Sequence, residues 1–131
     1  MALTVRGLVP LLEVFDLPKA VAFYRDVLGF ELVAGDELWW CMLKLGETTL
    51  MLNTAYERDE RPPEPEPPRA SAHADTSLYF ASPDLDAVYE HLRSKGWPVT
   101  APEVTSYGMR QVSTKDPDGF QIFFHAAASA A

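Results

Sequence analysis

Two stretches decide the fold: Asp-Leu-Pro-Lys-Ala-Val-Ala-Phe-Tyr-Arg-Asp-Val-Leu-Gly-Phe at residues 16–30, and Asp-Pro-Asp-Gly-Phe at residues 116–120. In the first, Asp16 is typical of a helix N-cap and Pro18 of a first helical turn. Apolar residues then recur at the helical period, and Gly29 stands where a left-handed C-terminal cap is expected. The second stretch is typical of a tight turn that leads into a strand.

Strands are predicted on both sides of the first helix. They cover residues 8–15, 30–33, 38–45 and 48–53. Gly46 and Glu47 form a plausible two-residue hairpin turn between the last two. The first half therefore follows the order β-α-β-β-β.

The second half follows the same order. Its strands are expected at 76–81, 98–100, 109–114 and 120–125, with a helix that begins after Asp84 and ends at Gly96. Three markers repeat in sequence: Asp16 matches Asp84, Gly29 matches Gly96, and Gly46 matches Gly119, at offsets of 68, 67 and 73 residues. Because the order and the predicted elements are both kept, the pattern indicates an internal duplication.

A proline-rich segment separates the two halves. Five of the eleven prolines fall between Pro62 and Pro68. Proline lacks a backbone donor and favours extended geometry, so residues 57–72 are predicted to be a semi-rigid acidic linker between modules at 1–56 and 73–126. An alternative is that this segment, or a sheet edge, binds another protein.

Composition and charge limit the classes of ligand that the protein is expected to bind. The 131 residues are 47% hydrophobic and carry a net charge of -8, which argues against nucleic-acid and anionic-membrane binding and favours a cationic small ligand. No apolar run reaches the roughly 20 residues that span a bilayer, and residues 1–6 lack the pattern of a secretion signal, so a cytoplasmic location is expected. Cys41 is the only cysteine, which excludes an intramolecular disulfide and favours a buried structural thiol.

The tandem β-α-β-β-β pattern, with the stretches 16–30 and 116–120, resembles the vicinal oxygen chelate superfamily, which contains glyoxalase I, dioxygenases and bleomycin-resistance proteins. The resemblance implies an α+β fold in which the two modules form a half-barrel with a ligand cleft, and a homodimer. In the metal enzymes of this superfamily, His and Glu ligands come from the first and last strand of each module. The corresponding positions here are Val9, Leu50, Ser77 and Phe123.

These four residues offer one hydroxyl and three hydrocarbons, so no metal and no other cofactor is expected. His73, His91 and His125 are expected to be solvated or structural. Strand alternation places His125 on the face of Phe123 and Gln121, so a role at the cleft stays open for this histidine.

The resemblance is closest to the metal-free bleomycin-resistance branch, which implies sequestration of a planar or cationic aromatic ligand such as an antibiotic. If Leu50 faces the cleft, then Leu43, Cys41 and Trp39 share that face, and Trp40, Met42 and Met51 face the helices. If the strand register shifts by one residue, Trp40 takes the place of Trp39 on the cleft face, so both tryptophans are candidates for stacking on a ligand ring. The expected ligand-binding residues are Val9, Glu13, Trp39, Trp40, Leu50, Ser77, Met109, Gln111 and Phe123.

Catalysis is the alternative function. A glyoxalase-like lyase, isomerase or dioxygenase-type enzyme would use Glu13 or His125 as a general base, and an apolar cleft can raise a carboxyl pKa toward neutrality. No second catalytic group stands at a fixed spacing from either residue. The sequence therefore favours a non-catalytic binding protein, with no catalytic residue assigned.

Overall fold

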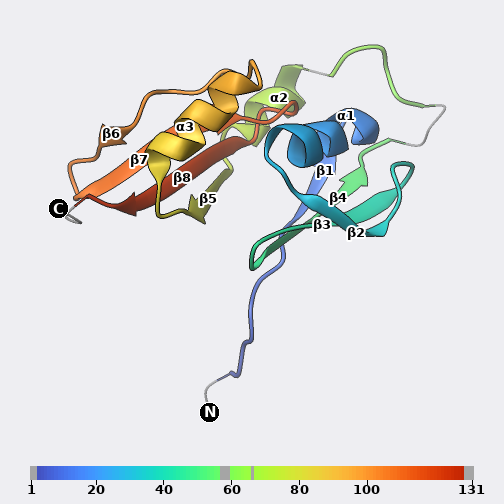
Figure 1. The fold of residues 1–131 in the computed structure, drawn as a ribbon. Helices are drawn as coiled ribbons and strands as arrows, with labels where there is room; N and C mark the ends of the chain where they lie inside the picture. The colour runs from blue at the N-terminus through green and yellow to red at the C-terminus, as the bar shows by residue number, and fades with distance from the viewer. Residues whose placement is uncertain (1–2, 57–59, 66, 129–131) are drawn as a thin grey trace. The chain divides into compact units, whose positions relative to one another are not determined.

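The computed structural model describes residues 3–56, 60–65 and 67–128, and it divides the chain into two compact units, Met1–Arg61 and Pro62–Ala131 (Figure 1). Each unit has one four-stranded mixed sheet and a helix packed on it. The architecture is thus the predicted α+β fold. The boundary between the units falls inside the segment 57–72.

The first unit contains four strands and one helical segment. Its elements are β1 (Leu11–Val14), α1 (Leu17–Ala22) with its π-helical continuation η1 (Phe23–Val27), β2 (Glu31–Gly35), β3 (Trp40–Leu45) and β4 (Thr48–Thr54). The strand order is β1-β4-β3-β2, in which β1 and β4 run parallel and the other neighbours run antiparallel. The connection from β1 through the helix to β2 therefore carries the chain across to the opposite edge of the sheet.

The second unit repeats this plan after one additional helix. Its elements are α2 (Pro67–His73), β5 (Ser77–Ala81), α3 (Leu85–Ser94), β6 (Glu103–Val104), β7 (Met109–Lys115) and β8 (Gln121–Ala127). The strand order β5-β8-β7-β6 has the same parallel and antiparallel pairings as the first sheet. The topology is that of the duplication inferred from the sequence.

The two predicted helix caps are confirmed. Asp16 accepts a hydrogen bond from the Lys19 backbone N–H at 3.1 Å, and Asp84 accepts one from the Ala87 N–H at 3.0 Å. Each bond satisfies a donor that the first helical turn would otherwise leave unpaired. The same local chemistry thus begins the main helix of each unit.

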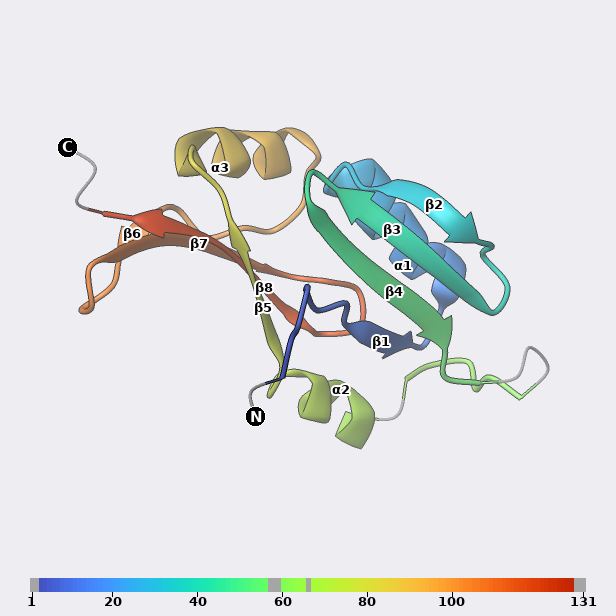
Figure 2. The same cartoon turned by 90° about the horizontal axis from the view of Figure 1, so that it is seen from below.

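The core of the first unit lies between α1 and its sheet. Figure 2, seen from below, shows the helix behind the strands of this sheet. Leu12, Leu52 and Cys41 are register partners across three strands, and all three are buried. Alternation therefore assigns the remaining face of this sheet, which α1 does not cover, to the residues between them.

The second core is built in the same way beneath α3. Its sheet contributes Val112, Ile122 and Phe124, and α3 contributes Leu85 and Leu92. Asp116 carries a buried carboxylate, which accepts hydrogen bonds from the backbone N–H groups of Asp118 and Phe120 at 2.9 Å each. These bonds fix the predicted turn that leads into β8.

The proline-rich segment differs from its prediction. Residues Pro67–His73 form α2, because proline is tolerated in the first helical turn, where its missing N–H has no intrahelical partner. Nδ1 of His73, at the helix end, lies 2.8 Å from the Asp118 carbonyl oxygen, and its ring stacks on Phe120. The helix is thus part of the second unit, whereas positions 57–59 and 66 of the predicted linker lie outside the described residues.

The predicted strand at 98–100 is also wrong, because the strand that pairs with β7 here is β6, at Glu103–Val104. Residues 98–100 still follow β7, through a hydrogen bond from the Thr100 N–H to the Ser113 carbonyl. Within the described part of the chain, no helix has the length and apolar character needed to cross a membrane.

Candidate functional site

The face of the first sheet that α1 leaves uncovered, here called the open face of the first unit, carries two rows of aligned side chains. The first row is Glu13, Asn53 and Trp40, and the second is Leu11, Met51 and Met42. Each row crosses β1, β4 and β3 in that order, so its members are direct neighbours on one face. The result is a sulfur-rich and aromatic surface with a carboxylate at one edge.

This geometry corrects the predicted assignment of faces on β3 and β4. Leu50 is 1% exposed and lies opposite Leu43 on the buried face, so it lines the core and not a cleft. Trp40, Met42 and Met51 lie on the open face, where the prediction had placed them toward the helix. The shift is one residue, which moves every side chain of a strand to the other face.

The two tryptophans are separated by the turn before β3. Trp40 is half-buried on the open face, whereas Trp39 precedes the strand and is 48% exposed. The Asp36 carboxylate accepts hydrogen bonds from the N–H groups of Leu38 and Trp39, at 2.8 and 3.1 Å. These bonds hold the pKa of Asp36 below its ordinary value, with the Leu38 bond contributing most.

Gly35 makes this turn possible. Its φ of +80° favours glycine, and a Cβ at this position would collide with the carbonyl oxygen of Trp40. The close approach of the two backbones is accompanied by a register irregularity between Leu32 and Ala34. The bulge and the tight turn together fix which tryptophan enters the strand.

Asn53 adds a polar group to the open face of the first unit. Its Oδ1 atom is buried and accepts no hydrogen bond from any residue that the structure describes. A buried carbonyl oxygen without a donor costs free energy that a bound N–H group would recover. The side chain lies between Glu13 and Trp40 in the first row, so it is placed to orient a ligand there.

The remaining predicted residues of this unit lie near the same face. Glu13 is exposed on β1 and alternates with the buried Leu12 and Val14. Val9 is 43% exposed and precedes β1, so it lies outside the strand. Their roles in binding a ligand stay predictions.

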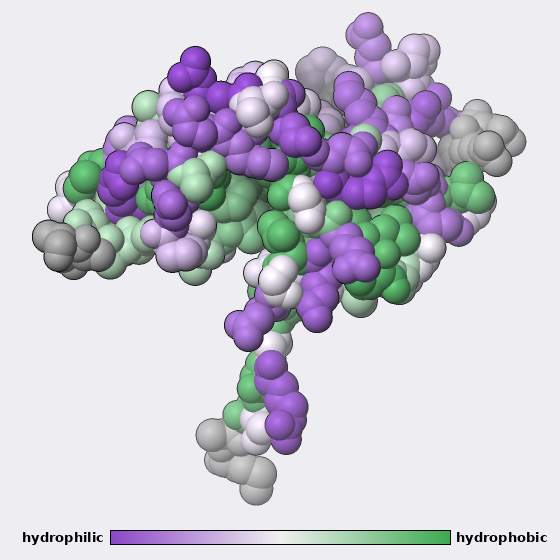
Figure 3. Space-filling model, viewed as in Figure 1, coloured by the Kyte–Doolittle hydropathy of each residue, from purple (hydrophilic) through white to green (hydrophobic). Residues whose placement is uncertain are grey.

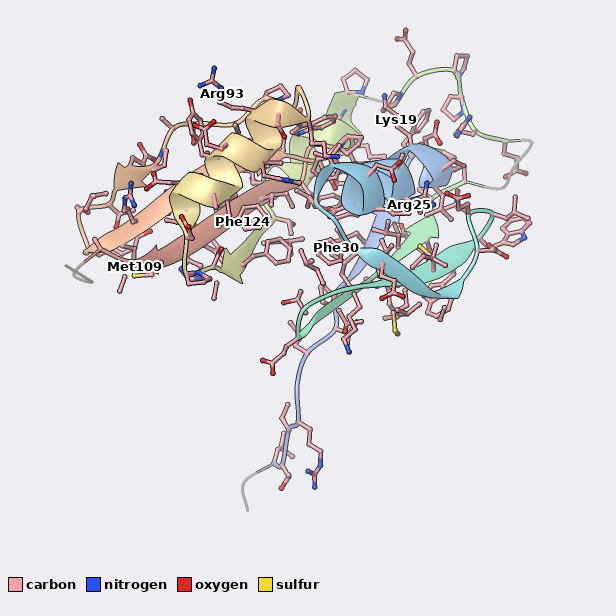
Figure 4. All side chains as sticks on the ribbon, viewed as in Figure 1. Lys19, Arg25, Phe30, Arg93, Met109 and Phe124 are labelled. Atoms are coloured by element: carbon pink, nitrogen blue, oxygen red, sulfur yellow. The ribbon has the colours of Figure 1, made fainter. Side chains whose placement is uncertain are left out.

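The second unit has a corresponding open face on the side that α3 does not cover. Its aligned rows are Ser77, Gln121 and Lys115; Tyr79, Phe123 and Ser113; and Ala81, His125 and Gln111. Three predicted ligand-binding residues, Ser77, Gln111 and Phe123, thus lie on one face. Met109, labelled in Figure 4, is the first residue of β7 and stands two residues before Gln111, so alternation places it on the same face.

An aromatic cluster occupies the middle of this face. The rings of Tyr79 and Phe123 stack with centroids 4.6 Å apart and planes at 6°, and His125 packs edge-on against Tyr79 at 5.4 Å. Tyr79 is 51% exposed, and it is not among the ligand-binding residues predicted from the sequence. Its even spacing from the predicted Ser77 on the same strand was a signal that could have identified it.

Gln111 has the same unsatisfied acceptor as Asn53. Its Oε1 atom is buried and has no hydrogen-bond partner among the described residues. Gln111 belongs to the row of His125, and Asn53 belongs to the row of Glu13. Each open face therefore presents one amide oxygen that lacks a donor within the described chain.

A hollow of about 760 Å³ lies beside β7 in the second unit. Trp97, Val99 and Pro117 contribute apolar walls, and Lys115 contributes a charge. The Trp97 indole N–H donates to the Lys115 carbonyl at 2.9 Å, which fixes the ring at the edge of the sheet. This hollow was not predicted from the sequence.

The donor chemistry of the open faces does not fit a divalent metal. Such an ion takes at least three oxygen, nitrogen or sulfur ligands from converging side chains. In the ranges 3–56, 60–65 and 67–128, no three His, Cys, Asp or Glu side chains gather into such a group. The expected absence of a metal cofactor stays a prediction, which elemental analysis of the purified protein tests.

Cys41 is not a candidate nucleophile. The side chain is fully buried in the first core, and burial raises the pKa of its thiol to about 11. A nucleophilic cysteine needs a depressed pKa and solvent access. The sequence-based expectation of a buried structural thiol is confirmed.

The surface in Figure 3 is hydrophilic over the helices and more apolar along the strands of the first unit. The exposed fractions agree with this distribution, since Val33 and Leu45 of β2 and β3 are 46% and 36% exposed. The sheets thus retain apolar surface in the described structure.

Comparison with known proteins gives a family and a fold. The sequence model described as "Glyoxalase/Bleomycin resistance protein/Dioxygenase superfamily" matches residues 9–124. A search of curated proteins found no match.

Solved structures resemble the chain over nearly its full length. A glyoxalase/bleomycin resistance protein/dioxygenase from Nocardioides has a TM-score of 0.74 at 18% identity, with 99% of this chain and 89% of that chain covered. A bleomycin resistance determinant encoded on transposon Tn5 has a TM-score of 0.72 at 24% identity, with 94% and 98% covered. The bleomycin-binding protein of Streptomyces verticillus, in complex with copper(II)-bleomycin, has 0.70 at 23% identity, with 94% and 97% covered.

Proposed function

The chain belongs to the glyoxalase/bleomycin resistance protein/dioxygenase superfamily, and on this premise we propose that it sequesters a small planar or cationic aromatic molecule, such as an antibiotic, without a metal. The supporting observation is the pair of open sheet faces: each has an aromatic side chain, the half-buried Trp40 or the exposed Tyr79, and one amide oxygen that lacks a donor in the described chain. Function within this superfamily is decided by such sites, since one fold hosts several chemistries.

Aromatic and sulfur-bearing side chains supply the binding surface. A flat ring placed on Trp40, Met42 and Met51 buries apolar area, and a cationic ring gains about 0.5–2 kcal/mol more from each well-placed aromatic face. Glu13 lies in the row of Trp40, where its carboxylate can orient a cation. Tyr79 and Phe123 offer the corresponding platform in the second unit.

Titration calorimetry and tryptophan quenching with bleomycin, with and without copper(II), test this proposal. Binding of a planar cation that weakens severalfold in Trp40→Ala supports it, and Trp97→Phe is the control for a tryptophan outside the open faces. If neither bleomycin nor other planar cations bind at sub-millimolar concentration, sequestration of this ligand class is excluded.

A homodimer in the cytoplasm, as predicted from the resemblance and the sequence, completes the proposal. Light scattering on the purified protein tests the dimer, since a single species of 14.6 kDa would contradict it. Fractionation of producing cells tests the location.

A glyoxalase-like enzyme is the second candidate, because His125 lies on the open face of the second unit, beside Gln111. An imidazole at this position could serve as a general base for a small oxygenated substrate. Turnover of such a substrate that is lost in His125→Ala, with ligand affinity kept, would favour this function over sequestration.

A further inference from the structure

Two hollows of about 380 and 360 Å³ lie at the carboxyl end of β4 and share the lining residues Thr54 and Tyr56. The second of them also includes Asn53, which belongs to the open face of the first unit. Each hollow is within the size range of small-molecule sites. We call the two together the β4-end groove.

The walls of the β4-end groove combine apolar surface with acid. Leu38 and Trp39 are 51% and 48% exposed, and Tyr56 lines both hollows. Among the described lining residues are three carboxylates, Asp16, Glu37 and Glu60, and one cation, Arg61. Arg25 also pairs with Glu37, at 3.5 Å, so one negative charge remains in excess. A surplus of negative charge beside aromatic faces is the environment that organic cations prefer.

The protein already places a guanidinium group in this groove. Arg61 Nη1 lies 3.3 Å from Asp16 Oδ2, and the Arg61 guanidinium carbon lies 5.4 Å from the centroid of the Phe15 ring. Phe15 in turn packs edge-on against Tyr56, with centroids 5.9 Å apart. Arg61 therefore demonstrates both contacts, with a carboxylate and with an aromatic face, that an external cation would make.

The other hollow of the groove has an acceptor without a donor. The buried Asn53 Oδ1 atom belongs to a lining residue, and no described residue donates to it. Glu60 lines the same hollow and is exposed. An N–H group of a bound ligand could satisfy the amide oxygen while its charge is balanced by the carboxylate.

We propose that the β4-end groove is a binding site for a small organic amidinium or guanidinium cation with an apolar body. The cation competes with Arg61 for the acidic wall, and its apolar body packs on Trp39 and Leu38. The side chain of Arg61 is 41% exposed, so the ion pair that the ligand displaces is a weak one. This site shares Asn53 with the open face of the first unit, whereas its acidic residues and its apolar residues Leu38 and Trp39 lie outside the two rows of that face.

Benzamidine, which is an amidinium cation at neutral pH, is the probe, with neutral benzamide as its shape-matched control. Titration calorimetry gives the affinity, and the indole N–H resonance of Trp39, assigned with Trp39→Phe, reports the location. We expect benzamidine to bind and to shift this resonance, and benzamide to do neither. Equal binding of the two would overturn the proposal, because the acidic wall would then have no role.

The decisive variants remove the Arg61 side chain, which competes with the ligand for Asp16. Arg61→Ala and Arg61→Gln are expected to tighten benzamidine binding about two- to fivefold, the range that the loss of one exposed ion pair allows. Arg93→Ala removes the same charge from α3 in the second unit and is expected to leave the affinity unchanged. If both Arg61 variants bind as weakly as the wild type, the proposal is wrong.

The acidic wall is tested separately. Glu60→Gln is expected to weaken benzamidine binding severalfold, and Glu90→Gln on α3 is its matched control. If Trp40→Ala abolishes benzamidine binding while Glu60→Gln has no effect, the probe occupies the open face, and only the groove is refuted. If the wild-type protein binds benzamidine but does not bind bleomycin, the result counts against the sequestration proposal alone.

Discussion

The two neighbours Leu50 and Met51 give opposite predictions because β4 exposes them on opposite faces. Leu50 is 1% exposed beside the equally buried Leu43, so Leu50→Ala leaves a cavity in a close-packed core. Such truncations cost about 2–5 kcal/mol of unfolding free energy. At about 4 °C per kcal/mol for a chain of this size, the melting temperature should fall by roughly 8–20 °C.

Met51 is half-buried on the open face of the first unit, opposite Met42. Met51→Ala removes apolar surface that is already partly hydrated, so it should cost only about 1 kcal/mol of stability. Its larger effect should be on ligand affinity, because the thioether belongs to the proposed stacking surface. Leu50→Ala, in its folded fraction, should retain that affinity.

Urea unfolding followed by circular dichroism, together with quenching titrations on both variants, measures the two effects. The m-value checks that the unfolded reference state is unchanged. A greater loss of stability in Met51→Ala than in Leu50→Ala would refute the assignment of faces. So would a loss of affinity confined to Leu50→Ala.

Three further predictions concern single groups. Iodoacetamide at pH 8 should leave Cys41 unmodified in the native protein and alkylate it in urea, because burial raises the pKa of its thiol to about 11; rapid native labelling, seen by mass spectrometry, would contradict this. Asp84→Ala should lower the free energy of unfolding, measured in urea, by about 1 kcal/mol, because the α3 cap is lost; Asp84→Asn should keep most of the stability of the wild type, because asparagine also caps helices. Asp36 has a lowered folded pKa, so its contribution to stability is present above pH 3.8 and is lost as the pH falls through that lower pKa; tryptophan emission should report this step in the wild type, and its persistence in Asp36→Asn would refute the assignment.

The fold could be predicted because its signals are local. Asp16 and Asp84 cap helices through their own side chains, and the turn at residues 116–120 is fixed by the Asp116 carboxylate. Such signals need no knowledge of distant contacts. Their repetition in one order then identified the duplicated β-α-β-β-β plan.

The face of β3 could not be predicted because its sequence does not alternate. Residues 39–43 are Trp, Trp, Cys, Met and Leu, all apolar. Because polar and apolar residues do not alternate here, the sequence does not indicate which face of the strand is buried. The choice depends on the bulge beside Gly35 and on the pairing of Cys41 with Leu52, which are tertiary features. On β1, by contrast, the polar Glu13 stands between the apolar Leu12 and Val14, and the burial of these three residues follows the same alternation.

The proline-rich segment shows a different limit of sequence reasoning. Composition alone favours an extended linker, yet Pro67 and Pro68 stand in the first turn of α2, where proline costs little. The helix is retained by contacts with the second unit, through His73 on Phe120 and the Gln121 amide that donates to the Ala74 carbonyl. These partners are more than 40 residues away in sequence, beyond the reach of a local pattern.

The duplication explains why the two open faces need not bind the same molecule. Helix caps and buried strand positions recur in both units, because each unit must pack one helix on one sheet. The open faces are free of that constraint, and they have diverged: Glu13, Asn53 and Trp40 form the row that corresponds to Ala81, His125 and Gln111. A carboxylate beside an indole favours a cationic ring, whereas an imidazole beside an amide favours a ligand with hydrogen-bonding groups. Exchanging Glu13→Ala and Ala81→Glu in one chain should therefore reduce affinity for a planar cation at the first face and create it at the second, and an unchanged binding site would show that the rows do not contact the ligand.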